Sequence, residues 1–326
     1  MNATINLEKN HFPVLLNELI SIISPLYGGT FIDCTLGQGG YSKEILKTKS
    51  NKVIALDRDP DVLQIAKKIE KHNKNRFNFF NSKFSEINKL NIKDNDLKAV
   101  IFDLGYSLNQ ILDFKKGLSF QSTGKLDMRL GLNQFSCDDV ISNISEKSLN
   151  KIFKIFGEEK NSKLIARRII QNRNKNKLKT EDLVNIVAEI KKYKFSKTNP
   201  STKIFQALRI YINKEISELI NGLIYSFKIL PVGGMIVVVT FHSIEDKIVK
   251  FFFKNYSDKK NSSRYAPNVI KNNKPIVPSN DEININPASR SAKLRYAIKT
   301  DENDNFNELH EKFNYLIETE NLSYNS

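Results

Sequence analysis

The chain of 326 residues has 51 lysines and arginines against 36 aspartates and glutamates, a net charge of +15, and 40% of its residues are hydrophobic. A chain of this size and composition buries a sizeable core, which excludes a disordered or fibrous protein. Its two cysteines, Cys34 and Cys137, fit neither a disulfide framework nor a metal site, and it has no signal peptide or apolar run of about 18 residues. We therefore expect a cytoplasmic protein with no membrane segment. The charge suits a nucleic-acid partner, although lysine-rich composition also arises from genomes biased to A and T.

Residues 30–59 have the order strand, glycine-rich loop, helix, strand. Before them, an apolar helical pattern at 19–23 ends ahead of Pro25. Two short apolar runs end at Asp33 and Asp57, and the loop between them holds Gly37, Gly39 and Gly40. This order is typical of the nucleoside-binding half of an α/β sheet, in which glycines allow backbone N–H groups to approach a ligand.

The ligand of this unit is open to two readings. A dinucleotide-binding loop requires Gly-x-Gly-x-x-Gly/Ala, but Ser42 occupies the last small position. Asp33 precedes the loop and suits a cationic ligand better than a pyrophosphate. S-adenosylmethionine (SAM) carries a sulfonium and an ammonium and no phosphate, so we favour it, with Asp57 accepting the ribose hydroxyl groups. Alternatively, the glycines form only a turn and bind no ligand.

Further strands alternate with helices up to residue 107. We expect a helix over 59–72, a third strand at 78–80 and a fourth at 98–102 that ends at Asp103. This alternation predicts a parallel, doubly wound sheet. The carboxyl ends of its strands share one edge, where Asp33, Asp57 and Asp103 all fall.

The pattern changes after residue 112, where strand signals vanish for about a hundred residues. Helical patterns cover 148–156, 164–170 and 180–190, and one long helix is expected from near Pro200 to about Pro231. A buried strand follows at 235–241. We therefore predict a discontinuous sheet domain, 1–111 with 214–300, and an inserted helical domain, 112–213. Residues 257–287 read as a polar loop, 294–298 as a last edge strand, and 301–326 as an extension with an amphipathic helix packed on the body.

Two strand ends carry candidate chemistry. Asp103-Leu104-Gly105-Tyr106 would place an acceptor near an exocyclic amine, which needs one N–H fixed so that its lone pair meets a methyl group. A strand-end Asp that caps a turn explains the same residue equally well. In Phe241-His242-Ser243-Ile244-Glu245-Asp246, the Ser and acids are expected to cap a helix, which leaves His242 free for chemistry. Asp103 and His242 are thus the candidate catalytic residues.

A set of motifs in order across residues 11–298 resembles the RsmH (MraW) family. The matching stretches are His11-Phe12-Pro13-Val14-Leu15-Leu16, Gly39-Gly40-Tyr41-Ser42, Asp57-Arg58-Asp59-Pro60, Asp103-Leu104-Gly105, Gly117-Leu118-Ser119-Phe120, Leu126-Asp127-Met128-Arg129, Gly157-Glu158-Glu159, Phe205-Gln206-Ala207-Leu208-Arg209-Ile210, Phe241-His242-Ser243-Ile244-Glu245-Asp246 and Ser289-Arg290-Ser291-Ala292-Lys293-Leu294-Arg295.

The resemblance implies a Rossmann-like class I methyltransferase sheet with an inserted all-helical RNA-recognition domain. It implies methyl transfer from SAM to N4 of a cytidine in the decoding region of 16S rRNA, in the small ribosomal subunit. It also implies that the SAM pocket is lined by Gly39, Gly40, Tyr41, Asp57, Phe84, Asp103 and Gln110.

Two residues depart from the family pattern beside that pocket. Tyr41 replaces a frequent His, and Leu108 replaces the second Ser of an Asp-Leu-Gly-Val-Ser-Ser stretch. The alternative functions are methylation of another RNA or DNA base, and a catalytically silent assembly factor of the same fold. The sequence does not distinguish a monomer from a homodimer.

Overall fold

The computed structural model describes residues 13–24, 27–90, 92, 96–106, 110, 113, 116–122, 124–173, 177–191, 199–257, 270–272 and 274–324. His11, Phe12 and the departure at Leu108 lie outside these ranges. Within them, no helix combines the length and the apolar character that crossing a membrane requires.

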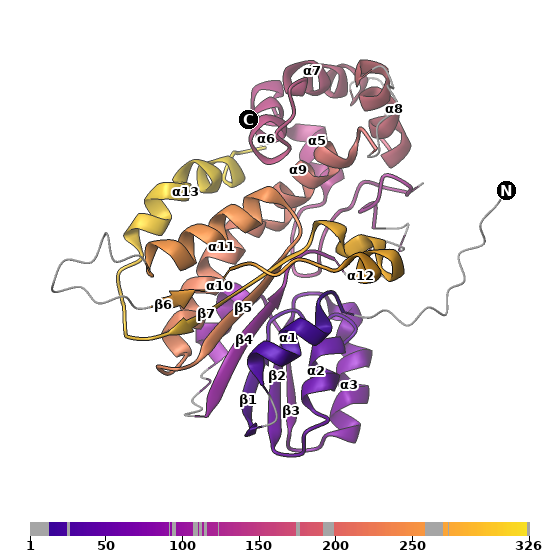
Figure 1. Cartoon of the computed structure of the whole chain (residues 1–326). Helices are drawn as coiled ribbons and strands as arrows, with labels where there is room; N and C mark the ends of the chain where they lie inside the picture. The colour runs from indigo at the N-terminus through magenta and orange to yellow at the C-terminus, as the bar shows by residue number, and fades with distance from the viewer. Residues whose placement is uncertain are drawn as a thin grey trace.

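A seven-stranded sheet with the order β3-β2-β1-β4-β5-β7-β6 forms the centre of the molecule (Figure 1). Its first five strands run parallel: β1 (Gly29–Asp33), β2 (Asn51–Asp57), β3 (Phe77–Asn81), β4 (Leu97–Asp103) and β5 (Met235–Thr240). Antiparallel strands β7 (Lys293–Lys299) and β6 (Ile270–Asn272) complete it. The predicted Rossmann-like α/β class is confirmed.

One predicted edge strand is not at the edge. The strand expected at 294–298 is β7, and β6 pairs with it on the outer side. Because β6 is only three residues long and lies in a polar, lysine- and asparagine-rich segment, it shows no apolar run. The same segment holds α12 (Asn280–Ile285), which Ser279 caps by accepting the N–H of Glu282 at 3.2 Å. The expectation of a continuous loop over 257–287 is therefore wrong.

Both faces of the sheet are covered by helices, which is why its parallel strands read as continuous apolar runs. One face packs against α1 (Leu16–Ile23), α2 (Gly40–Ile45) and α3 (Leu63–His72) through residues such as Leu19, Ile45 and Ile69. The other face packs against the short helix η3 (Phe84–Leu90), α10 (Glu215–Ile229) and α11 (Ser243–Asn255), and α13 (Asn307–Glu320) packs on α10 and α11. Two short helices, η2 (Pro60–Val62) and η4 (Pro287–Ser291), complete this part of the chain.

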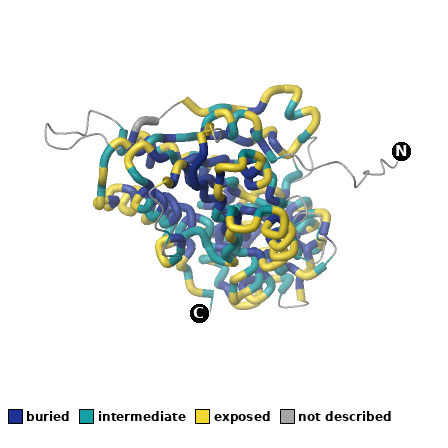
Figure 2. The backbone as a smooth tube through the Cα atoms, turned by 90° about the horizontal axis from the view of Figure 1, so that it is seen from below, coloured by how far each residue is buried: buried dark blue, intermediate teal, exposed yellow. Residues whose placement is uncertain are grey.

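Five further helices gather above the sheet in Figure 1: α5 (Cys137–Asn143), α6 (Glu146–Phe156), α7 (Ser162–Arg173), α8 (Thr180–Lys191) and α9 (Thr202–Asn213). Their buried side chains, among them Phe153, Ile165 and Leu208, belong to the same apolar cluster as Phe102 of the sheet. Figure 2 shows buried segments running through the middle of the molecule. The helical part thus shares a continuous core with one face of the sheet, and its boundaries at 112 and 213 stay a prediction.

The long helix expected between residues 200 and 231 is two helices. The chain breaks at Lys214, whose φ of 54° and ψ of 40° lie in the left-handed region, between α9 and α10. No glycine or proline lies at this break, so the sequence does not predict it. Tertiary contacts of the preceding residue stabilise the break: the side-chain amide of Asn213 donates to the carbonyl of Met128 at 2.9 Å and accepts the N–H of Leu130 at 2.8 Å.

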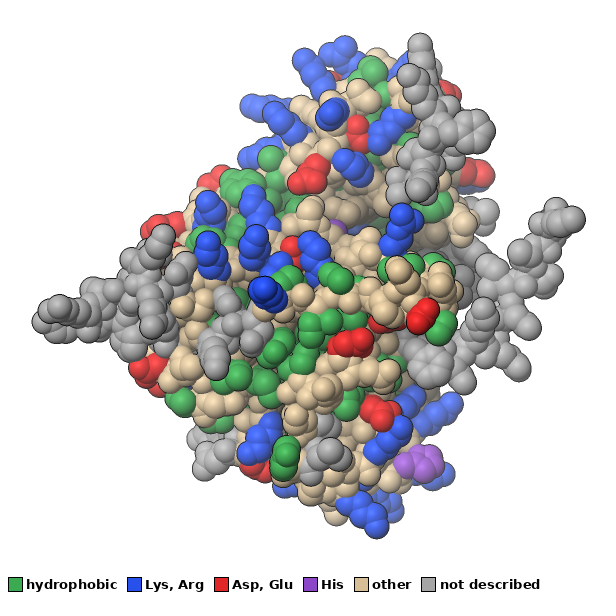
Figure 3. All heavy atoms as spheres, viewed as in Figure 1, with side chains coloured by type: hydrophobic (Ala, Val, Ile, Leu, Met, Phe, Trp, Pro, Cys, Tyr) green, Lys and Arg blue, Asp and Glu red, His purple; other side chains and the backbone are tan. Residues whose placement is uncertain are grey.

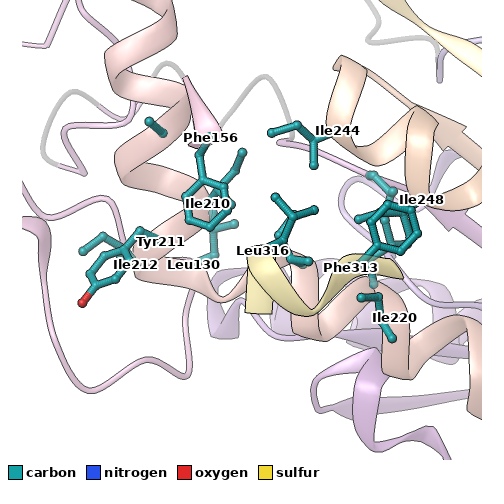
Figure 4. Close-up of a cluster of buried hydrophobic side chains, with 14 of the residues drawn as sticks. Leu130, Phe156, Ile210, Tyr211, Ile212, Ile220, Ile244, Ile248, Phe313 and Leu316 are labelled. Carbon is teal, nitrogen blue, oxygen red and sulfur yellow. The ribbon is translucent and has the colours of Figure 1, made fainter. Parts of the chain in front are cut away.

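The predicted C-terminal helix is α13, and it packs on the body as expected. Leu309, Phe313 and Leu316 are buried. Figure 4 shows Phe313 and Leu316 beside Ile220 of α10 and Ile248 of α11, so the helix is an integral part of the core.

Candidate active site

A cavity of about 560 Å³ lies at the carboxyl ends of β1, β2 and β4, where the sequence placed the ligand. One wall, the strand-end wall, consists of the loop after β1 and the ends of β2 and β4. A second part of the lining, the α10 wall, holds Glu215, Glu218 and Leu219 of α10, with Phe241 and Glu245 from the turn between β5 and α11. The sheet and the beginning of α10 therefore line the same cavity.

The glycine loop makes a turn that no larger residue fits. Gly39 has a φ of 72°, and a Cβ there would lie 2.5 Å from Cδ1 of Ile69. A Cβ on Gly40 would lie 2.0 Å from Cγ of Pro13. Gly40 lines the cavity, whereas Gly39 is absent from the described residues that line it and serves the turn.

Asp57 lines the cavity and is held by backbone donors. Its Oδ2 accepts the N–H of Gly37 at 2.9 Å, and its Oδ1 accepts the N–H of Asp59 at the same distance. Burial raises the pKa of Asp57 to about 6. Each oxygen retains a lone pair for a further donor, so this carboxylate suits a pair of ligand hydroxyl groups.

Asp33, in contrast, is used internally. It is fully buried and accepts the hydroxyl of Ser42 at 2.6 Å and the N–H of Thr35 at 3.3 Å. This contact explains why a serine stands at the last small position of the loop. Asp33 is absent from the described residues that line the cavity, and its charge contributes to raising the pKa of Asp103.

Asp103 has an unusual environment at the end of β4. Its backbone N–H donates to the hydroxyl of Thr35 at 2.8 Å, while its Oδ1 is buried with no hydrogen-bond partner among the described residues. Burial, together with the charges of Asp33 and Glu245, raises the pKa of Asp103 to about 8. It lines the cavity as an acid whose lone pairs are free, and a positive ligand beside it would favour its ionised form.

The other three residues expected in the pocket also line it. The hydroxyl of Tyr41 donates to the carbonyl of Val14, so this ring is fixed in the wall. Phe84 packs edge-on against Phe102, with ring centroids 5.3 Å apart. Gln110 donates from Nε2 to Oδ2 of Asp59 at 2.6 Å. Of the seven predicted pocket residues, all but Gly39 thus lie on the cavity.

His242 is placed differently from the expectation. It is the N-cap of α11: its Nδ1 accepts the N–H of Glu245 at 3.4 Å, and Glu245 in return accepts the N–H of Phe241 at 2.8 Å. Ser243 is exposed, and Asp246 pairs with Arg295 at 2.7 Å instead of capping. The assumption that capping leaves His242 free is therefore wrong, and His242 is absent from the described residues that line the cavity.

The sequence does not predict the ion pair between Arg209 and Glu215 at the α10 wall. Nε of Arg209 lies 2.8 Å from Oε1 of Glu215, and its guanidinium lies 4.3 Å from the ring centroid of Tyr106. Both Tyr106 and Glu215 line the cavity. Tyr106 and Arg209 both belong to quoted stretches, but the sequence assigns no role to either. Glu215 lies in a helix whose apolar pattern hides any functional signal.

Glu215, His242 and Glu245 offer three metal-ligand atoms within 4.8 Å of one another. Nε2 of His242 lies 3.0 Å from Oε1 of Glu245, and Nε of Arg209 lies 2.8 Å from Oε1 of Glu215. Nε2 of His242 and Oε1 of Glu215 are nevertheless buried without a hydrogen-bond partner among the described residues. The three residues thus form a compact polar cluster at the edge of the α10 wall.

Proteins named ribosomal RNA small subunit methyltransferase H are similar to this chain over most of its length. The protein of Orientia tsutsugamushi (strain Ikeda) is 40% identical over 308 residues, which cover 90% of this chain and 99% of that protein. The protein of Ehrlichia ruminantium (strain Welgevonden) is 38% identical over 298 residues, covering 89% of this chain and 99% of its own. Among solved structures, an rRNA methylase from Streptococcus thermophilus is 11% identical with a TM-score of 0.37, covering 87% of this chain and 96% of that one.

Residues 8–300 match the model of the MraW methylase family. The match includes both strand-end acids on the cavity, Asp57 and Asp103, and the whole helical part above the sheet. The resemblance seen in the motifs is thereby confirmed: this chain belongs to the MraW methylase family.

Proposed function

We propose that this protein transfers the methyl group of SAM to N4 of a cytidine in the decoding region of 16S rRNA, within the small ribosomal subunit. The observation that carries this proposal is the cavity itself. A hydroxyl-binding carboxylate, Asp57, and a carboxyl group with free lone pairs, Asp103, line it at the ends of β2 and β4, on either side of β1. The names of the relatives support ribosomal RNA of the small subunit as the substrate. The amine and its position rest on the family resemblance.

SAM is the cofactor of this methylase. The residues present fit it: the two oxygens of Asp57 would accept the ribose hydroxyls, and the loop at Gly37 and Gly40 leaves room for the methionine moiety. Bound there, SAM supplies an electrophilic methyl group and a positive charge. That charge opposes the burial that raises the pKa of Asp103 and favours its carboxylate form.

Asp103 would then orient the target amine. The amine of cytosine is planar and donates its lone pair into the ring, so it needs orientation more than deprotonation before attack. One oxygen of Asp103 would accept one N–H and leave the lone pair in line with the methyl group. Its negative charge would also offset the positive charge that develops on nitrogen. His242 would act only through Glu245, on the α10 wall.

The helical part, residues 112–213, would hold the RNA. Lys and Arg gather over α6 and α7 at the top of Figure 3, and the exposed ones are Lys147, Lys151, Lys154, Lys160, Lys163, Arg167 and Arg168. Phosphate contacts of this kind position RNA without reading its sequence. A cytosine stacked in structured RNA would be swung out to reach the cavity.

The test is methylation of small ribosomal subunits that lack the modification. Incubation with labelled SAM should add methyl groups, and mass mapping should place them on N4 of a cytidine in the decoding region. Methylation of a different base would identify another base methyltransferase. SAM binding without any methyl transfer would identify a silent assembly factor and overturn the proposal.

A further inference from the structure

The beginning of α10 has no cap of its own. Its N-cap residue, Lys214, lies in the left-handed region and makes no side-chain hydrogen bond to the helix. The first N–H groups of a helix have no partner within it and require one from elsewhere. A partner for the first turn of α10 must therefore come from another part of the chain.

Glu320, the last residue of α13, supplies that partner. Its Oε1 accepts the N–H of Ile216 at 2.7 Å, and its Oε2 accepts the N–H of Ser217 at 3.0 Å. The hydroxyl of Ser217 donates to the same oxygen. The Glu320 side chain is fully buried, so these donors replace its water shell, and burial raises its pKa to about 7. Its carboxylate form, which dominates above that pH, complements the positive end of the helix dipole.

The segment that follows Glu320, up to Tyr324, makes contacts with α9 and with the helical part of the chain. The hydroxyl of Tyr211, in the last turn of α9, donates to the carbonyl of Leu322. The rings of Tyr324 and Phe135 meet edge-on with centroids 5.0 Å apart. Phe313 and Leu316 anchor α13 in the core (Figure 4). Glu320 therefore has a defined position relative to both helices.

The turn that Glu320 holds is the one that faces the cavity. Glu215, Glu218 and Leu219 line it, and they lie within the first two turns of α10. Glu215 is the partner of Arg209, which in turn packs on Tyr106, three residues after Asp103. A shift in the start of α10 would thus move a whole wall of the site.

We infer that Glu320 is a positioning residue for methyl transfer, which caps α10 from the far end of the chain and fixes the α10 wall. The inference rests on the proposed function and gives a role to residues after 300, where the family match ends. Within the described part of the chain, the hydrogen bonds of Glu320 go to Ile216 and Ser217, and none goes to the glycine loop or to Asp57. Loss of Glu320 should therefore disturb transfer and spare cofactor binding.

The variant Glu320→Gln tests this. Gln retains one acceptor oxygen but turns an NH₂ group toward the N–H of Ile216 or Ser217, so the first turn loses one of its bonds. We expect the single-turnover rate at saturating SAM to fall roughly 10-fold, with SAM affinity within about 2-fold of the wild type. Amide hydrogen exchange at Ile216 and Ser217 should become faster, which reports on the cap without any RNA.

Two controls separate positioning from stability. Glu318→Gln changes an exposed residue of the same helix whose side chain accepts a bond from Asn314 at 2.7 Å, and it should leave every measurement unchanged. Leu309→Ala empties a core position about three turns away from Glu320. It should lower the melting temperature and, well below that temperature, keep the rate.

A wild-type rate in Glu320→Gln overturns the inference, as does a rate loss in Leu309→Ala as large as that in Glu320→Gln. Loss of SAM affinity in Glu320→Gln would also overturn it. Absence of methyl transfer in the wild type would instead refute the proposed function, and the exchange measurement would still decide whether Glu320 holds α10.

Discussion

Asp57 and Asp103 are two carboxyl groups that line one cavity, and burial raises the pKa of Asp103 more than that of Asp57. Burial raises the pKa of Asp57 to about 6, and the two backbone N–H groups that it accepts limit this rise. Asp103 has an unpaired oxygen and two acidic neighbours, and its pKa rises to about 8. At neutral pH the first is mainly a carboxylate, and the second depends on a nearby positive charge to ionise.

Removing the charge of Asp103 should slow methyl transfer. Asp103→Asn retains an acceptor oxygen for the amine but cannot offset the developing positive charge, so we expect the rate at saturating SAM to fall on the order of 10²–10³-fold. Some loss of SAM affinity should accompany it, because Asp103 lines the same cavity. Single-turnover measurement at saturating SAM separates the two effects. A saturated rate equal to the wild type would leave Asp103 as a cofactor ligand only.

The same variant should flatten the dependence of stability on pH. The pKa of Asp103 is about 8 in the folded protein, against 3.8 for an aspartate free of such interactions. Between these values the folded protein binds more protons than the unfolded chain, so its free energy of unfolding falls as pH rises. Asp103→Asn should reduce that fall, between pH 5 and pH 8, by on the order of 1–3 kcal/mol. Urea titrations at both pH values measure it, and parallel curves for the two proteins would contradict the burial argument.

Asp57→Ala should weaken SAM binding. It removes the acceptor for the ribose hydroxyls, which is worth about 1.5–3 kcal/mol, or roughly 10- to 150-fold in affinity. Calorimetric titration with SAM measures the change. Unchanged affinity would rule out a ribose contact.

At the scale of elements, the first five strands and most helices follow from the sequence because their signals are local. Runs of Val, Ile and Phe that end at Asp33, Asp57 and Asp103 identify parallel strands and the edge where they end. The break at Lys214 does not follow, because Asn213 holds it through contacts with Met128 and Leu130, residues distant in the chain. Glu215 and Glu320 escape notice for the same reason, since their partners come from other elements.

Helices α6 and α7 provide a test of RNA binding. Lys151→Glu with Arg168→Glu reverses two exposed charges, and we expect RNA affinity to fall by about 10-fold or more. The slope of log affinity against log salt should drop by about one for each phosphate that the variant no longer neutralises. The matched control, Lys67→Glu with Lys71→Glu, reverses two exposed charges on α3 and should have little effect. Equal losses in both double variants would show that net charge alone binds the RNA.

On one face of the sheet, the buried side chains of the sheet and of the helical part form one connected hydrophobic core. Phe102 of the sheet and Phe153 and Leu208 of the helical part belong to a single cluster of buried side chains. A deletion of residues 112–213 would therefore expose part of that core, which makes charge reversal the cleaner test of RNA binding.

This continuity predicts one cooperative thermal transition for the full chain, without a separate step for the helical part. Differential scanning calorimetry checks it by comparing calorimetric and van't Hoff enthalpies. Two resolved transitions, of which only one shifts on addition of SAM, would show that residues 112–213 unfold on their own.

The cap on α10 also has a consequence for the order in which the protein matures. Glu320 lies 104 residues after Ile216, whose N–H it accepts. Synthesis proceeds from the N-terminus, so the glycine loop, Asp57 and Asp103 are all made before α10 has its carboxylate. A nascent chain paused after β7 would hold the cofactor-binding residues while the α10 wall still lacked its support. Helix α13, made after all of these residues, would thus complete an enzyme that we propose acts on ribosomes.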